Sequence, residues 1–167
     1  MSSTVDASWV QVDPEHPLVP VVLKLPPGLE HKLITLSATE AIFMVKVPGT
    51  DALLQLGVDR VQSPDDFTAQ ITSQGGKTAI ESRAGKLGGK DATEACGTLE
   101  VPLPFAVVQS GSGSVQEVPE HVQKARYGGY FVKLGDRVFR ATYRIPEKEA
   151  DRWEPVFRTI LSSLTWK

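Results

Sequence analysis

The chain has 167 residues, of which 41% are hydrophobic and 23% charged, and its 18 basic and 20 acidic residues leave a formal net charge of −2. This composition predicts one domain over residues 1–167 that buries its own core without disulfides or metal. The balanced charge excludes a general attraction to nucleic acid or acidic membranes, and no apolar run reaches the roughly 20 residues of a membrane span.

The N-terminus carries no targeting segment that the sequence makes visible. Residues 1–8 have neither a basic start nor an apolar stretch, and we expect them to form a loose start. This favours the cytoplasm, although a mature secreted or organelle-lumen domain that has lost its targeting segment would look the same. Cys96 is the only cysteine, which excludes an internal disulfide.

The first part of the chain consists of short strands separated by turn-forming residues. Clusters of Pro and Gly, such as Pro26-Pro27-Gly28 and Pro48-Gly49, punctuate stretches rich in aliphatic and β-branched residues. The strands expected here are residues 9–12, 19–25, 33–36 and 41–47.

A short helix is expected to begin after Ser63, which is a good N-cap followed by Pro64 at the first helical position. Phe67 and Ile71 lie four residues apart and therefore share a face of this helix, which Gly75-Gly76 ends. Strands are expected next at residues 79–86 and 91–99. Residues 100–125 are rich in Pro, Gly and Ser and predict a long irregular loop, either functional or disordered.

The clearest unit is a hairpin followed by a helix. Residues 130–134 and 137–145 are rich in aromatic and β-branched residues, and Gly135-Asp136 suits the tight turn between them. If Leu134 faces Arg137, counting outward places Phe131 opposite Arg140 and Tyr127 opposite Arg144. One face of this hairpin is apolar and predicts a core face; it carries Tyr130, Val132, Phe139, Ala141 and Tyr143.

The other face of the hairpin combines aromatic and arginine side chains. Tyr127, Phe131, Arg140 and Arg144 are the four candidate partner-binding residues, because aromatic and arginine side chains dominate binding hot spots. The alternative is that a second layer of the same chain, such as the helix after Ser63, covers these aromatic residues.

The last helix has an apolar stripe that needs a sheet to cover. Its members recur at spacings of three and four: Ala150, Trp153, Phe157, Ile160, Leu161 and Leu164. Pro146 favours a helix start, but Pro155 predicts either a kink or a regular helix that begins only at residues 151–154. Trp166 is either an exposed anchor or part of the core. These elements predict an α+β fold with a mainly antiparallel sheet, N-terminal strands, one short middle helix and a long C-terminal helix.

No pattern in the sequence names a reaction. The Gly-Lys sequences near residues 76 and 90 lack P-loop spacing, and there is no Gly-x-Ser-x-Gly elbow. His16, His31 and His121 are scattered rather than paired with each other or with Cys96 at metal-ligand spacings. We therefore expect no catalytic residue, no metal site and no cofactor.

Several stretches resemble PsbP-like and DcrB-like domains. They are the opening at residues 25–30, where Leu29 stands in place of the usual Trp, the capped helix after Ser63, the glycine turn at 87–92, the hairpin at 132–143 and the helix at 153–164. The resemblance implies an α/β/α sandwich. It also implies a non-enzymatic role, since members include photosystem II extrinsic subunits, a Ran-binding nuclear-transport factor and adaptors of type VI secretion effectors.

The sequence therefore leads to a non-catalytic protein-binding or adaptor module whose partner is another protein rather than nucleic acid. Two alternatives stay open. One is a chaperone-like adaptor for a secreted effector, which requires an exposed apolar groove along the sheet. The other is an enzyme or small-ligand-binding domain whose site is assembled from distant residues, with His31 or His121 beside carboxylates in a pocket.

Overall fold

The computed structural model describes residues 5–102, 107–109, 115–117 and 122–167, which form two helices and twelve strands. The helices are α1 (Pro64–Ser73) and α2 (Glu147–Ser162). The strands in chain order are β1 (Val10–Val12), β2 (Val21–Leu25), β3 (Glu30–Ser37), β4 (Glu40–Lys46), β5 (Leu53–Val58), β6 (Lys77–Leu87), β7 (Lys90–Pro102), β8 (Val107–Gln109), β9 (Val115–Glu117), β10 (Val122–Leu134), β11 (Arg137–Pro146) and β12 (Thr165–Trp166).

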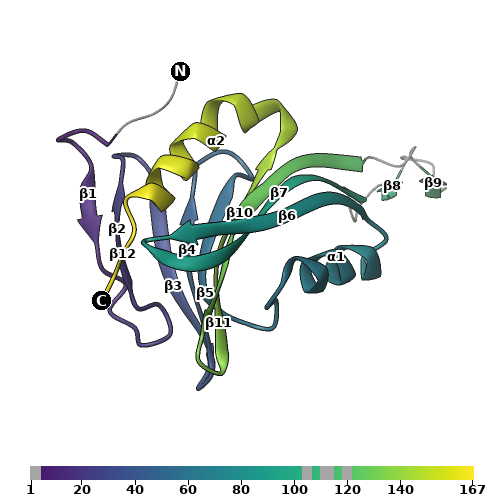
Figure 1. Cartoon of the computed structure of the whole chain (residues 1–167). Coiled ribbons are helices and arrows are strands. Elements are labelled where there is room, and N and C mark those ends of the chain that lie inside the picture. Colours follow the sequence, from purple (N-terminus) through teal and green to yellow (C-terminus); the bar gives the residue numbers. More distant parts are fainter. Residues whose placement is uncertain (1–4, 103–106, 110–114, 118–121) are drawn as a thin grey trace.

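A seven-stranded sheet in the order β3-β4-β5-β11-β10-β7-β6 forms the middle layer, and every neighbouring pair in it is antiparallel. Figure 1 shows α2 along one face of this sheet and α1 on the opposite side, beneath β6 and β7. The predicted α/β/α sandwich is confirmed. A smaller sheet, β1-β2-β12, lies beside α2, and β8 pairs with β9. Neither helix in the described ranges is long and apolar enough to cross a bilayer.

The hairpin of β10 and β11 has the predicted register. Leu134 pairs with Arg137, Phe131 with Arg140, and Tyr127 with Arg144. Gly135 opens the turn with a φ of 65°, a conformation that glycine adopts without a steric penalty. The turn chemistry therefore set the register, and the register determined which side chains share each face.

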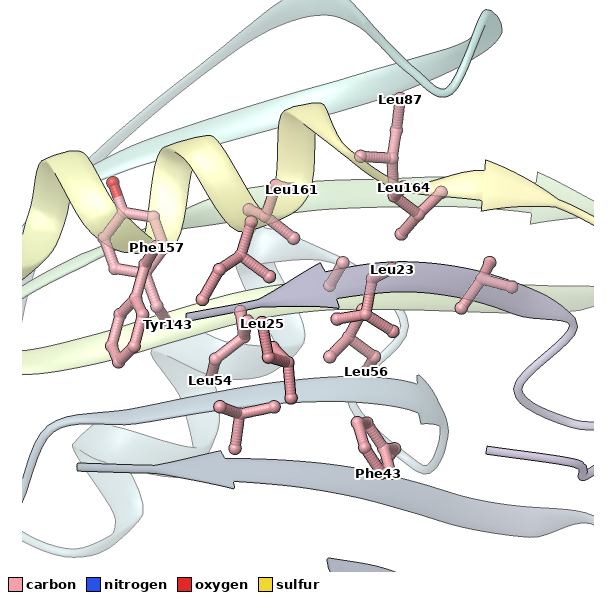
Figure 2. Close-up of a cluster of buried hydrophobic side chains, with 14 of the residues drawn as sticks. Leu23, Leu25, Phe43, Leu54, Leu56, Leu87, Tyr143, Phe157, Leu161 and Leu164 are labelled. Carbon is pink, nitrogen blue, oxygen red and sulfur yellow. The ribbon is translucent and has the colours of Figure 1, made fainter. Parts of the chain in front are cut away.

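The first core lies between α2, β2 and the sheet (Figure 2). Phe157 and Ile160 of α2 are fully buried there, as the apolar stripe predicted, while Trp153 is half-buried. The predicted core face of the hairpin supplies Val132, Phe139, Ala141 and Tyr143 to the same cluster. Trp166 packs edge-on against Phe139 and donates from Nε1 to the Leu87 carbonyl at 2.9 Å, so it extends the core.

The α2 helix is continuous from Glu147 through Pro155, so the later start at residues 151–154, one of the two predicted alternatives, is wrong. Pro155 removes one backbone hydrogen bond and costs about 3 kcal/mol in a helix interior. Ala150 is buried one turn before the proline, and Glu154 accepts a hydrogen bond from the Tyr143 hydroxyl at 2.9 Å. These tertiary contacts hold the first turns in helical form.

The second core lies on the other face, under α1. The Ser63 side chain accepts a hydrogen bond from the Asp66 backbone N–H at 3.1 Å, which confirms the predicted N-cap. Phe67 and Ile71 point from α1 into a cluster with side chains of β7 and β10, which are Ala95, Leu99, Ala125, Tyr127 and Phe131. The helix therefore covers the β10-β7-β6 half of the sheet.

Strand β5 is absent from the sequence-based expectation. Gly57 lies within this strand, although glycine has low strand propensity and no side chain to pack. A Cβ at Gly57 would stand 2.0 Å from the Ala41 carbonyl oxygen of β4, so only glycine allows the two strands to approach this closely. Gly57 is therefore required for this pairing of β5 with β4.

The segment predicted as one long loop at residues 100–125 is partly strand. Here β7 continues to Pro102 and β10 begins at Val122, which pairs with Pro102. Long-range pairing therefore extends both strands beyond their local propensity. Residues 103–106, 110–114 and 118–121 of this segment and residues 1–4 of the expected loose start lie outside the described ranges.

Candidate functional site

A groove of about 400 Å³ opens on the α1 side of the sheet, next to the half that α1 covers. We call it the α1 groove. Figure 1 shows β3, β4, β5 and β11 to one side of α1. Apolar and polar side chains both line the groove: Ile34, Leu36, Ile42, Met44, Leu53, Gln55, Asp59, Phe67, Gln70, Ile71, Gln74, Tyr127, Arg140, Thr142, Tyr143 and Arg144.

The wall formed by β3, β4 and β5 is mainly apolar, and Gln55 of β5 is its one polar residue among those that line the groove. Phe43 and Val45 of β4 point into the core under α2, so Ile42 and Met44, which alternate with them, point toward the groove. Leu36 at the edge strand β3 is 55% exposed. This wall keeps apolar surface in contact with solvent where α1 does not reach.

A buried ion pair lies at the base of the groove. The Arg140 guanidinium donates from Nε to Asp59 Oδ1 at 2.9 Å and from Nη2 to Oδ2, and from Nη1 to the Thr142 hydroxyl at 2.9 Å. Asp59 also accepts from the Val61 backbone N–H at 3.0 Å, just before α1. Asp59 therefore connects the sheet to the segment that leads into the helix.

Tyr127 lies beside this ion pair and is only 2% exposed. Its ring stacks on Phe67 of α1, with centroids 3.9 Å apart. Its hydroxyl makes no hydrogen bond of normal geometry with the described residues, although the Thr142 side chain is near enough to favour its ionised form. Burial raises the pKa of Tyr127 to about 12, and the positive charge of Arg140 opposes that rise.

The tyrosines provide a pH prediction. Burial raises the pKa of Tyr127 to about 12 and also raises the pKa of Tyr130 and Tyr143, the other two tyrosines of the chain. The pKa of Tyr127 in the folded protein exceeds the unfolded value of 10.0, so the neutral hydroxyl contributes to the stability of the fold. This contribution is fully present below pH 10 and is lost as pH rises toward 12. We expect little tyrosinate absorbance from the folded protein near pH 10 and a normal titration in denaturant. Three native tyrosines that titrate normally in the intact fold would contradict this.

The structure separates the four predicted partner-binding residues. Tyr127, Phe131 and Arg140 are buried, the first two under α1 and the third against Asp59, so they do not form an exposed face. The covering helix is the one after Ser63, which was the stated alternative. Arg144 alone is exposed, and it lies on the rim of the α1 groove.

The two histidines in the described ranges, His16 and His31, do not line the α1 groove. His31 lies on β3 and contacts the Phe43 ring at a centroid distance of 5.4 Å, and His121 lies outside the described ranges. Within those ranges, no three His, Cys, Asp or Glu side chains are close enough together to hold a metal ion. A local sequence motif could not have indicated the groove, since its residues come from five strands and one helix.

A second recess lies on the opposite face, beside α2. Cys96 and Thr98 of β7 line it together with Arg126, Glu154 and Arg158. Its charges largely compensate one another, since Arg126 Nη1 lies 3.8 Å from Glu154 Oε1. It lacks the exposed apolar wall of the α1 groove, which makes the groove the stronger candidate site.

Comparisons with known proteins bear on the fold. No protein-family model matches the sequence, and no curated protein matches it. Among solved structures, the solution structure of cyanobacterial PsbP (CyanoP) from Synechocystis sp. PCC 6803 is similar with a TM-score of 0.52 and 13% identity, covering 100% of this chain and 97% of that one.

A crystal structure from Bacteroides thetaiotaomicron VPI-5482 is similar with a TM-score of 0.45 and 10% identity, over 91% of this chain and 47% of that one. This weaker similarity adds no argument. The match to the cyanobacterial protein extends over the whole chain and agrees with the seven-stranded sheet between two helices. The chain therefore has the PsbP-like fold.

Proposed function

We propose that this protein is a non-catalytic binding module that holds a segment of another protein in the α1 groove. The observation that supports this most strongly is the half of the sheet that α1 leaves uncovered. Leu36 there is 55% exposed, and Met44 and Leu53 are half-buried. Burial of apolar surface stabilises an interface by about 25 cal/mol per Å², so a partner that covers this wall gains binding energy.

The shape of the lining favours a polypeptide over a small molecule. Pockets of about 300–1,000 Å³ also hold small ligands, and they bury most of the ligand's surface. In the α1 groove the apolar side chains are spread along β3, β4 and β5 and end at an exposed leucine on the sheet edge. Such a wall makes its contacts along a segment instead of around a compact ligand.

The test uses a displayed library of random peptides of about twelve residues, which span roughly 40 Å when extended. Peptides selected on the immobilised protein are added to isotope-labelled protein, and amide chemical shifts are followed by NMR. We expect the shifts to concentrate on β3, β4, β5 and α1. Shifts confined to β1, β2 and α2 would contradict the proposal.

A pair of matched variants sharpens this test. Met44→Asp places a charge on the groove wall and is expected to reduce peptide affinity by tenfold or more, about 1.4 kcal/mol. Val10→Asp is the control, because Val10 on β1 is 61% exposed and lies outside the groove. Equal affinity of the two variants would count against the groove.

A chaperone-like adaptor is the second candidate. The uncovered apolar wall of β3, β4 and β5 favours it, because a chaperone must shield apolar segments before they fold. Such a protein would delay aggregation of an apolar client at stoichiometric ratios and would accept apolar segments of any charge. A light-scattering assay with wild type and Met44→Asp measures the delay of aggregation. Peptide selection with variants of Arg144 measures whether segments of any charge are accepted.

A further inference from the structure

We infer that the segment bound in the α1 groove carries a carboxylate side chain, which pairs with Arg144 at the polar end of the apolar wall. The inference rests on the proposed function and specifies the chemistry of the partner. It assigns to Arg144 the role of selecting among apolar segments.

Arg144 is a cation without an ion-pair partner in the described ranges. Two arginines of β11 line the groove. Arg140 forms an ion pair with Asp59, whereas Arg144 takes part in none of the ion pairs of the described residues. Asp51 shares an adjoining recess with Arg144 and influences it electrostatically, but its carboxylate receives the Gln123 side-chain amide at 3.3 Å. The Arg144 guanidinium is thus available to an external carboxylate.

Other side chains that can form hydrogen bonds line the same groove as Arg144. Tyr127 is the direct cross-strand partner of Arg144, but its hydroxyl is buried. Gln55 lies opposite Thr142 on the next strand, and Gln70 faces the groove from α1. A partner segment would find side-chain donors and acceptors for its polar groups next to the apolar wall.

The position of Arg144 makes its charge selective. It lies beside the apolar side chains of Met44 and Leu53, in a recess that Lys46 and Asp51 also line. A partner that covers the wall removes water from the guanidinium, and an unpaired charge is then costly while a bidentate carboxylate pair is strong. An apolar segment with a nearby Asp or Glu covers the wall and also pairs with the Arg144 guanidinium. An apolar segment with a Lys or Arg beside Arg144 is rejected.

The test repeats the peptide selection with wild type, Arg144→Glu and Arg137→Glu. The peptides are fused to their carrier through their C-termini, so that only side chains supply carboxylates. Arg137 is the matched control, since it is an exposed arginine of the same strand that does not line the groove. We expect wild type and Arg137→Glu to select apolar peptides containing Asp or Glu, and Arg144→Glu to select apolar peptides containing Lys or Arg.

A selected acidic peptide should also lose roughly ten- to hundredfold in affinity for Arg144→Gln, and its Asp→Asn or Glu→Gln derivative should lose the same from wild type. The reversed preference of Arg144→Glu shows that this variant is folded. If wild type and Arg144→Glu select the same apolar peptides regardless of charge, the inference is wrong while the groove remains a binding site, as a chaperone-like adaptor requires. If neither wild type nor Arg144→Glu selects peptides that fail to bind Met44→Asp, the inference about Arg144 and the proposed function are both wrong.

Discussion

Replacing Asp59 with alanine is expected to lower the free energy of unfolding by about 3–5 kcal/mol, the usual cost of removing one partner from a buried ion pair. The side chain of Arg140 is 8% exposed and that of Asp59 is 12% exposed. The variant therefore leaves the Arg140 guanidinium in a desolvated site with only Thr142 as partner. It also removes the acceptor of the Val61 N–H that precedes α1. Urea denaturation followed by circular dichroism measures the change.

Two further variants separate the loss of the pair from the loss of a surface charge. Arg83 and Glu94 form an equally regular bidentate pair at 3.0 and 3.1 Å, but the arginine side chain is 68% exposed. Arg83→Ala is therefore expected to cost far less than Asp59→Ala. The double variant Asp59→Leu/Arg140→Met should recover much of the stability, because apolar replacement of a buried pair is often neutral. A loss from Asp59→Ala no larger than that from Arg83→Ala would show that the pair is not buried as described.

Replacing Phe157 with alanine is expected to cost about 3–5 kcal/mol, the range for removing a large aromatic side chain from a core. Phe157 is fully buried, and its ring lies between those of Tyr143 on the sheet and Trp153 on the same helix, at 6.0 and 6.4 Å. The cavity would lie between α2 and the sheet, within the first core (Figure 2). Thermal and urea unfolding of the variant measure the loss.

The control for this prediction lies in the same helix. Lys148 is exposed, and Lys148→Ala is expected to change stability by no more than about 0.5 kcal/mol, because alanine is also a good helix former. A cost for Phe157→Ala below about 1 kcal/mol would mean that α2 does not close this core. The first core and the α1 groove lie on opposite faces of the sheet, so the folded fraction of Phe157→Ala should still bind the selected peptides.

Tyr127 and the Asp59–Arg140 pair adjoin each other at the base of the α1 groove. Ionisation of Tyr127 at high pH and removal of Asp59 both place an uncompensated charge there. Each should therefore loosen α1 from the sheet before the first core under α2 is lost, and amide hydrogen exchange of α1 would detect this order.

The sequence by itself determined the local elements of this protein and the alternation of their side chains. Gly135-Asp136 specified the turn, and counting from it placed Phe131 opposite Arg140 and Tyr127 opposite Arg144, as observed. Ser63 specified the start of α1. These features follow from turn geometry, capping and periodicity, which act over a few residues.

Only the tertiary structure decided what covers each face. The hairpin pattern showed that Tyr127, Phe131 and Arg140 share a face. It did not indicate whether solvent, a partner or α1 covers that face. The answer depends on Phe67, about 60 residues earlier in the chain than Tyr127, and on Asp59, which directly follows β5. Because α1 is too short to span seven strands, the same packing that buries three of the predicted residues leaves Arg144 and the apolar wall open. That remaining surface arises from contacts between residues distant in the sequence, and no local pattern contains it.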